Sequence, residues 1–313
     1  MMHAMMLAAT FFWAVNIIAV KEALTGFISL ALTQLRITLA GIVFVALFGI
    51  TGKYRGLKLS RRDWIFMFFI GVTGVTLNQL SFIAGLQYSS ASHAGLIVAL
   101  GPIMVLVLAC SIGLEALTIP KFVGMLVAFG GVAILTTAKG GAGSPKAWLG
   151  DLILLAGSAF FAAYTILVKE VADKFDALTI NALAYVIGVP LLAPFTMPAL
   201  HEVHWGEVPS GAWWALAYAV FFGSILPYII FAWAMTELTA ARVAAFGYFQ
   251  PLIATGFGVW MLHEKLSVRL LIGGVLILGG LYLTERERGE EQATVEIKTP
   301  SREGDSATSP SPP

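Results

Sequence analysis

The chain is written as long apolar runs that alternate with short polar connections. A helix that crosses a bilayer needs roughly 20 consecutive apolar residues. The runs are continuous, whereas a membrane barrel would show short alternating strands, and lipid does not tolerate the unpaired backbone of an open sheet. The pattern therefore predicts an all-α integral membrane protein with ten transmembrane helices. They are expected at 5–24, 30–50, 64–85, 92–113, 121–138, 148–168, 178–197, 212–234, 243–262 and 269–284.

Composition supports lipid as the solvent of this chain. Of the 313 residues, 58% are hydrophobic and only 12% are charged, and the mean hydropathy is +0.85. Soluble domains carry about 25% charged residues, so the charges here are too few to cover a water-facing surface. The net charge of +1 gives no indication of a nucleic-acid partner. The single cysteine, Cys110, excludes an intrachain disulfide and a multi-cysteine metal site.

The distribution of Lys and Arg predicts the orientation of the chain. The connection 51–63 holds five of these residues and the connection 198–211 holds none. The positive-inside rule places 51–63, and with it both termini, in the cytoplasm of a multi-pass protein of the cell inner (plasma) membrane. The N-terminal run lacks the basic region and cleavage site of a signal peptide, so we interpret it as the first span. The charged and Ser/Pro-rich segment 285–313 is predicted to be a disordered cytoplasmic tail.

The chain contains the same pattern twice. GPIMVLVLACSIGLE at 101–115 aligns without a gap with QPLIATGFGVWMLHE at 250–264, and both begin with a proline at the second position and end on an acid. Each half, 4–138 and 148–284, is therefore predicted to be one five-helix repeat. Because five is an odd number, the second copy enters the membrane from the opposite side. Inverted repeats of this kind build secondary transporters, with the substrate site near the midplane between the halves.

The chain resembles the EamA-like family of the drug/metabolite transporter superfamily. The resemblance lies in the two five-helix repeats, the proline early in each fourth helix, the acid at the end of that helix and the glycines of each fifth helix. The resemblance implies a secondary transporter of small metabolites that works by alternating access, and it favours efflux of amino acids or related compounds. A drug or sugar-derivative carrier of the same superfamily is the alternative. A membrane-embedded enzyme is disfavoured, because the chain shows no paired carboxylates, metal motif or base-linked nucleophile. No cofactor is expected.

Polar side chains inside spans are costly and therefore point to a substrate pathway. Trp13 and Asn16 share one helix face. Tyr164 aligns with Asn16, and Tyr228 aligns with Gln79, so the polar positions recur in both halves. Amides and aromatic faces suit a small polar or zwitterionic molecule with an apolar part, although each side chain could instead form an interhelical hydrogen bond. The predicted cavity residues are Trp13, Asn16, Asn78, Gln79, Tyr164, Tyr228, Tyr248 and Gln250.

Prolines and glycines mark the special positions of the predicted helices. Each proline leaves a backbone carbonyl unbonded and kinks its helix, either as a hinge at the cavity or as a static bend. These prolines are Pro102, Pro227 and Pro251. In the fifth helix of each half, two glycines seven residues apart share one face, which predicts close helix packing. These glycines are Gly124, Gly131, Gly273 and Gly280.

Two ionisable residues in or beside the predicted spans are candidates for a role in transport. Arg36 could snorkel outward, bind a substrate carboxylate or form a structural pair. His93 is expected at a solvated helix start, and it is the first choice for a proton carrier because no acid is expected in the middle of a span. The sequence HEVH at 201–204 lacks the spacing of a zinc motif, so no metal is expected. The expected partners are membrane lipid and a small-molecule substrate, and a homodimer is compatible with the sequence.

Overall fold

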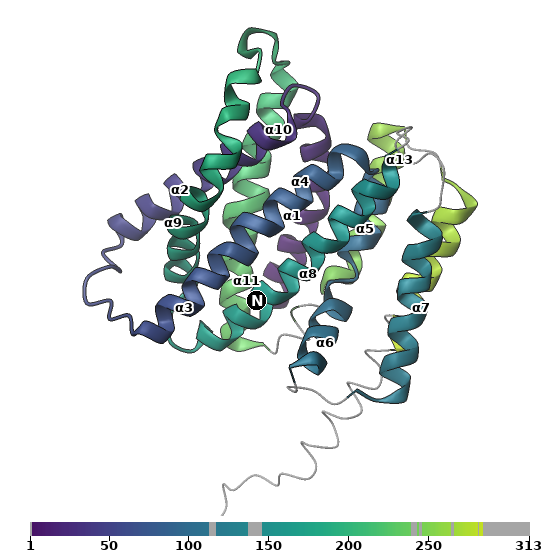
Figure 1. Ribbon diagram of the computed structural model, residues 1–313, viewed down its shortest axis with the longest axis horizontal. Helices are drawn as coiled ribbons and strands as arrows, with labels where there is room; N and C mark the ends of the chain where they lie inside the picture. The colour runs from purple at the N-terminus through teal and green to yellow at the C-terminus, as the bar shows by residue number, and fades with distance from the viewer. Residues whose placement is uncertain are drawn as a thin grey trace, which may run out of the picture.

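The computed structural model describes residues 2–112, 117–136, 146–238, 243, 246–263, 266–280 and 282–283, and these residues form helices and no strand (Figure 1). The first half contains α1 (Met2–Ala23), α2 (Ser29–Ile50), α3 (Arg61–Ile70), the π-helical η1 (Gly71–Leu77), α4 (Asn78–Tyr88), α5 (Ala91–Val98), α6 (Gly101–Ser111) and α7 (Ile119–Thr136). The second contains α8 (Ala147–Ala172), α9 (Ala177–Thr196), the short 3-10 helices η2 (Pro198–Glu202) and η3 (Trp205–Glu207), α10 (Ser210–Val220), the π-helical η4 (Phe221–Ile225), α11 (Leu226–Glu237), the 3-10 helix η5 (Phe246–Phe249), α13 (Gln250–Leu262) and a helix at Val268–Gly280.

The predicted all-α membrane class is confirmed in the described part of the chain. Seven helical stretches have the length and apolar composition of a membrane span. The other three predicted spans, 121–138, 243–262 and 269–284, contain shorter apolar helices at Ile119–Gly131, Ile253–Leu262 and Val268–Gly280. The count of ten spans therefore stays a prediction.

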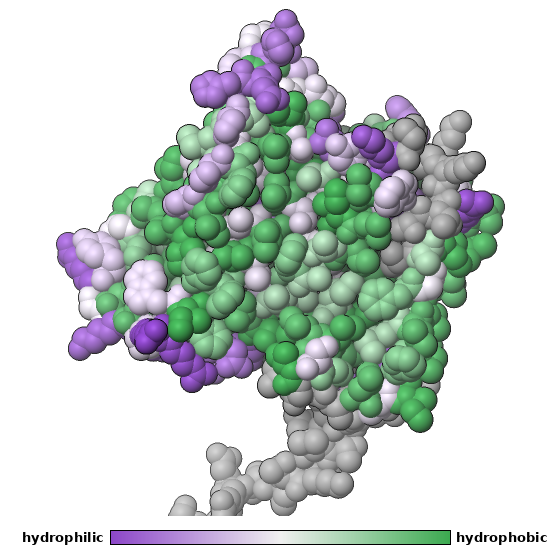
Figure 2. Space-filling view, in the orientation of Figure 1, coloured by the Kyte–Doolittle hydropathy of each residue, from purple (hydrophilic) through white to green (hydrophobic). Residues whose placement is uncertain are grey.

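Apolar side chains cover much of the outer surface. Figure 2 shows them across the middle of the molecule, with hydrophilic side chains gathered at its upper and lower left margins. Trp214 is 78% exposed and Phe195 is 74% exposed. Soluble monomers rarely expose apolar patches of such extent, so this surface fits contact with lipid.

The connection between α2 and α3 lies at the same end of the molecule as the connection between α8 and α9. Lys53 Nζ lies 2.6 Å from Asp176 Oδ1, and Lys174 pairs with Asp63 in the capping box that starts α3. Partial burial acts to raise the pKa of the Asp176 carboxyl, but hydrogen bonds from Lys53 and Thr179 outweigh burial and hold that pKa below its ordinary value. Ten spans with 51–63 in the cytoplasm would also put the connection between α8 and α9 on the cytoplasmic side, so the structure agrees with this part of the prediction.

The helices of the two halves pack against each other rather than forming separate bundles. α4 lies along α8, α2 lies along α9, and α1 contacts α10, α11 and α13. The approach of α4 to α8 depends on glycine, because a Cβ atom added to Gly150 would lie only 2.7 Å from the carbonyl oxygen of Gly85. The centre of the molecule is thus an interface between the halves.

α7 and the helix Val268–Gly280 form a pair at the edge of the molecule, and the four glycines predicted to mediate close packing lie between them (Figure 1). A Cβ atom on Gly131 would lie 2.7 Å from the carbonyl oxygen of Gly273, and one on Gly280 would collide with the carbonyl oxygen of Gly124. Each glycine face therefore packs on the backbone of the other helix, as expected for small residues in membrane helices.

This contact predicts opposite effects for two adjacent substitutions. Gly131→Ala should lower the melting temperature of the detergent-purified protein, because forcing an atom into a packed contact costs about 1–3 kcal/mol. Gly130→Ala should leave it unchanged or raise it, since a Cβ atom there meets nothing within 4 Å in the described structure and Ala favours a helix over Gly by roughly 0.5–1 kcal/mol. Equal melting temperatures for the two variants would show that these helices do not pack through glycine.

Candidate functional site

A central cavity opens between the two halves. Its walls come from α1, α2, α4 and the break between α5 and α6 in the first half, and from α8, η4, α11 and the η5–α13 region in the second. Six of the eight predicted cavity residues contribute. The polar and charged side chains of the lining are Thr10, Trp13, Asn16, Arg36, Asn78, Gln79, Ser158, Thr165, Tyr228 and Gln250.

A π-helical segment interrupts the third span of each half at matching positions. η1 precedes α4, which begins at Asn78, and η4 precedes α11, which carries Pro227 in its first turn. π-segments are rare and occur often at functional sites. Pro227 therefore follows a change of helix type, which the sequence did not predict, and it is buried outside the cavity lining.

Both π-segments bring polar groups together across the two halves. Gln79 Nε2 donates a hydrogen bond to the Tyr228 hydroxyl at 3.1 Å, and that hydroxyl donates to Asn78 Oδ1 at 3.3 Å. Asn78 Nδ2 donates in turn to the carbonyl oxygen of Gly157 at 3.0 Å. These three predicted residues thus line the cavity and also connect α4 with α8 and α11.

The fourth span is broken at the cavity. α5 ends at Val98, two residues follow in a turn, and α6 begins with Pro102 in its first turn. Proline is tolerated there because the first amides of a helix have no intrahelical partner. In the second half, η5 gives way to α13 at Gln250, which lines the cavity next to Pro251. The side chains of Pro251 and Tyr248 lie outside the described structure, as do Glu115, Glu264 and the tail 285–313.

Aromatic rings surround one side of the cavity. The ring of Trp13 lies 5.9 Å from that of Phe161, 5.7 Å from that of Tyr228 and 5.7 Å from that of Phe231. Trp13 Nε1 donates a hydrogen bond to the carbonyl oxygen of Gly223 at 3.1 Å, which fixes the indole. We call Trp13, Phe161, Tyr228 and Phe231 the aromatic cluster.

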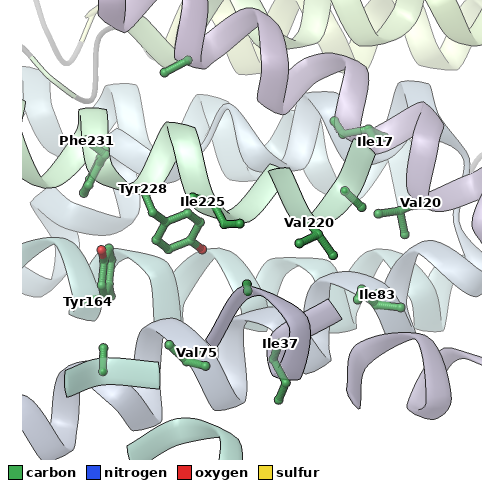
Figure 3. Close-up of a cluster of buried hydrophobic side chains, with 14 of the residues drawn as sticks. Ile17, Val20, Ile37, Val75, Ile83, Tyr164, Val220, Ile225, Tyr228 and Phe231 are labelled. Carbon is green, nitrogen blue, oxygen red and sulfur yellow. The ribbon is translucent and has the colours of Figure 1, made fainter. Parts of the chain in front are cut away.

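Tyr164 differs from its predicted place in the lining. Its ring stacks on Phe231 at 5.9 Å and packs directly on the backbone of Gly74 in η1. Figure 3 shows it on the helix that faces the helix of Tyr228 and Phe231, among buried side chains. Tyr164 therefore packs behind the aromatic cluster and does not line the cavity. The prediction was wrong because the alignment with Asn16 fixed the level of Tyr164 along its helix but not the packing around it.

Arg36 does not snorkel to the membrane surface, as one sequence interpretation held. It is only 2% exposed and lies in the cavity lining. Its Nε donates a hydrogen bond to Ser224 Oγ at 2.8 Å, and its guanidinium lies 5.9 Å from the centre of the Phe82 ring. None of the described lining residues is an acid, so the cavity contains a buried cation without an anionic partner.

His93 is not at a solvated helix start, which corrects the sequence prediction. It is 2% exposed, and its Nδ1 lies 2.9 Å from Oδ2 of Asp151, which is fully buried in α8. The Ser89 hydroxyl donates to the other carboxylate oxygen. Asp151 was missed although it stands inside a predicted span, where a lone acid is itself a signal. This buried triad joins the halves and lies outside the cavity lining.

Apolar helices of membrane-spanning length surround a central cavity that carries polar side chains, an arrangement that fits a membrane transporter. The model of the EamA-like transporter family matches this chain twice, over residues 1–137 and 148–286. The chain belongs to the EamA-like transporter family, which confirms the resemblance found in the sequence.

Individual relatives agree with this class. An uncharacterized transporter of Archaeoglobus fulgidus is 28% identical over 287 residues, which cover 90% of this chain and 96% of that protein. A probable terminal-alkyne amino-acid exporter of Streptantibioticus cattleyicolor is 26% identical and is matched over 90% of its length and 88% of this chain. A solved crystal structure shares the fold with a TM-score of 0.63 at 18% identity, over 90% of this chain and 96% of that one.

The buried triad predicts a large loss of stability on removal of its acid. Asp151→Ala should lower the melting temperature of the purified protein, because a buried polar group without its partner costs about 1–3 kcal/mol, and both His93 and Ser89 would lose theirs. Asp173→Ala removes the same charge at the exposed end of α8 and should have little effect. A melting temperature that is the same for both variants would contradict a structural role of the triad.

Proposed function

We propose that this protein is a secondary transporter that exports amino acids or related small metabolites by alternating access. The observation that carries the proposal is the composition of the cavity wall. Residues of both halves form it, and they include residues beside the interrupted helices of each half, such as Pro102 in the first half and Gly223 in the second. A site shared between two repeats is the arrangement that alternating access requires.

The interruptions supply the flexibility that such a mechanism needs. The π-segments η1 and η4 and the breaks before α6 and α13 disturb the regular hydrogen-bond ladder in helices that border the cavity. Each half can then bend at its own interruptions while the rest of its helices stay rigid. If one half opens while the other closes, the cavity changes the side from which it is accessible.

The lining chemistry supports the substrate class. The lining combines amide and hydroxyl groups and one cation with the rings of the aromatic cluster, which suits a small zwitterion with an apolar part. The name of the exporter from Streptantibioticus cattleyicolor supports the same class. For the membrane we propose the cell inner membrane with both termini in the cytoplasm, on the basis of the five basic residues in 51–63.

The proposal predicts counterflow in proteoliposomes. Vesicles that contain the purified protein and a high internal concentration of unlabelled amino acids should transiently accumulate the labelled amino acid from outside, with saturation. Ser158→Trp should abolish the accumulation, because Ser158 lies in the cavity wall on α8 and the indole would fill the space. Cells that express the wild-type protein should also release preloaded amino acid faster than cells that express this variant.

Ser111→Trp is the matched control, because Ser111 is exposed near the end of α6, and it should transport like the wild type. Melting temperature and gel filtration establish that both variants are folded. Label that only equilibrates, without transient accumulation, would indicate a channel. The absence of counterflow with every amino acid, but its presence with a sugar derivative or a drug, would reject the proposed substrate and favour the alternative carrier.

A further inference from the structure

Two buried polar atoms of the cavity residues have no hydrogen-bond partner in the described structure. One is a donor, Nη1 of Arg36, and the other is an acceptor, Oδ1 of Asn16. Both residues are 2% exposed, and both line the cavity. Buried polar groups in proteins are nearly always hydrogen-bonded, so this pair of atoms calls for a partner that enters the cavity.

Both side chains converge on the same point of the backbone. A Cβ atom built on Gly223 in η4 would collide with Asn16 Oδ1 and would lie 2.9 Å from Arg36 Nη2. Only glycine leaves this space open. The π-helical segment therefore brings a cationic donor from α2 and an amide acceptor from α1 next to each other at the cavity wall.

The chemistry of the two groups is complementary to the head group of an amino acid. A guanidinium presents a planar fork of donors that matches a carboxylate, and an amide oxygen accepts a hydrogen bond from an ammonium. A buried charge without a partner is costly, and the described lining contains no acid that could offset Arg36. A carboxylate that arrives with the substrate would do so.

We propose that Arg36 and Asn16 form the head-group site of the cavity, in which Arg36 binds the carboxylate and Asn16 the ammonium of a neutral, apolar amino acid. The inference rests on the proposed transport function and names its substrate class. The substrate side chain lies against the aromatic cluster, which begins beside the same glycine because Trp13 donates to the Gly223 carbonyl. With Arg36 as the only charged side chain of the described lining, nothing there pairs with a charged substrate side chain.

Binding to the detergent-purified protein tests the site without requiring transport. The probes for calorimetry are leucine, leucinamide, which lacks the carboxylate, and 4-methylpentanoate, which lacks the ammonium. Leucine should bind about tenfold or more tightly than either analogue, because a charge-assisted hydrogen bond contributes about 1.5–3 kcal/mol.

Each variant should remove the preference for one group. Arg36→Gln should weaken leucine binding to the level of leucinamide while leaving leucinamide binding unchanged. Asn16→Leu should remove the preference for leucine over 4-methylpentanoate. Thr33→Val alters a buried residue of α2 outside the described cavity lining and should leave the ranking of the probes as in the wild type. Without ligand, Arg36→Gln should not lower the melting temperature, since it removes an unpaired buried charge.

Three results would overturn the head-group site. In the first, the wild type binds leucinamide as tightly as leucine, and in the second, folded wild-type protein binds no leucine. In the third, Arg36→Gln weakens the binding of all probes equally and lowers the melting temperature. The last result would make Arg36 a structural residue. The predicted binding pattern without counterflow would instead reject the transport function and keep the site. Counterflow without the binding pattern would keep the transport function and reject the site.

Discussion

The interior of a bilayer offers no hydrogen-bond partners to a protein backbone, so a spanning helix can be interrupted only where protein or a cavity covers the interruption. Here four of the described interruptions lie in helices that border the cavity, while Pro190 and Pro194 stand inside α9, outside its lining. The π-segments η1 and η4 and the breaks before α6 and α13 surround one cavity. Side chains take over the exposed backbone groups where they are needed, as Trp13 does for the carbonyl of Gly223. The position of the cavity thus follows from the same constraint that makes the rest of the chain helical.

A buried charged group also needs partners, and its partners distinguish two kinds of site in this protein. Asp151 has both carboxylate oxygens satisfied, by His93 and Ser89, and this satisfied triad connects the halves away from the cavity. Arg36 has Ser224 on one nitrogen and no partner on Nη1 within the described structure. The triad of Asp151, His93 and Ser89 stabilises the fold, whereas Nη1 of Arg36 can still donate a hydrogen bond to a ligand. This difference in hydrogen bonding is the reason why Asp151 has a structural role and Arg36 is proposed to bind substrate.

Doubling of the sequence leads to interlocked halves. α4 packs along α8, with Gly85 and Gly150 in close approach, and α2 packs along α9. Glycine thus sets how closely the two halves approach each other at α4 and α8. The pair formed by α7 and the helix Val268–Gly280 lies at the edge, where its own glycine contact holds it together, and neither helix contributes to the cavity lining.

The sequence by itself determined the membrane class, the family and six of the polar residues that line the cavity. Apolar runs of spanning length can only be helices in lipid, and polar residues in such runs are too costly to be accidental, so Trp13, Asn16, Gln79 and Tyr228 were found without a structure. Only the tertiary structure decided that Tyr164 lies behind the cavity, that His93 is buried against Asp151 and that Arg36 points inward. Periodicity fixes the level and face of a side chain along its own helix. Its partners come from other helices, and the π-segments that help to bring them close were not predicted from the sequence.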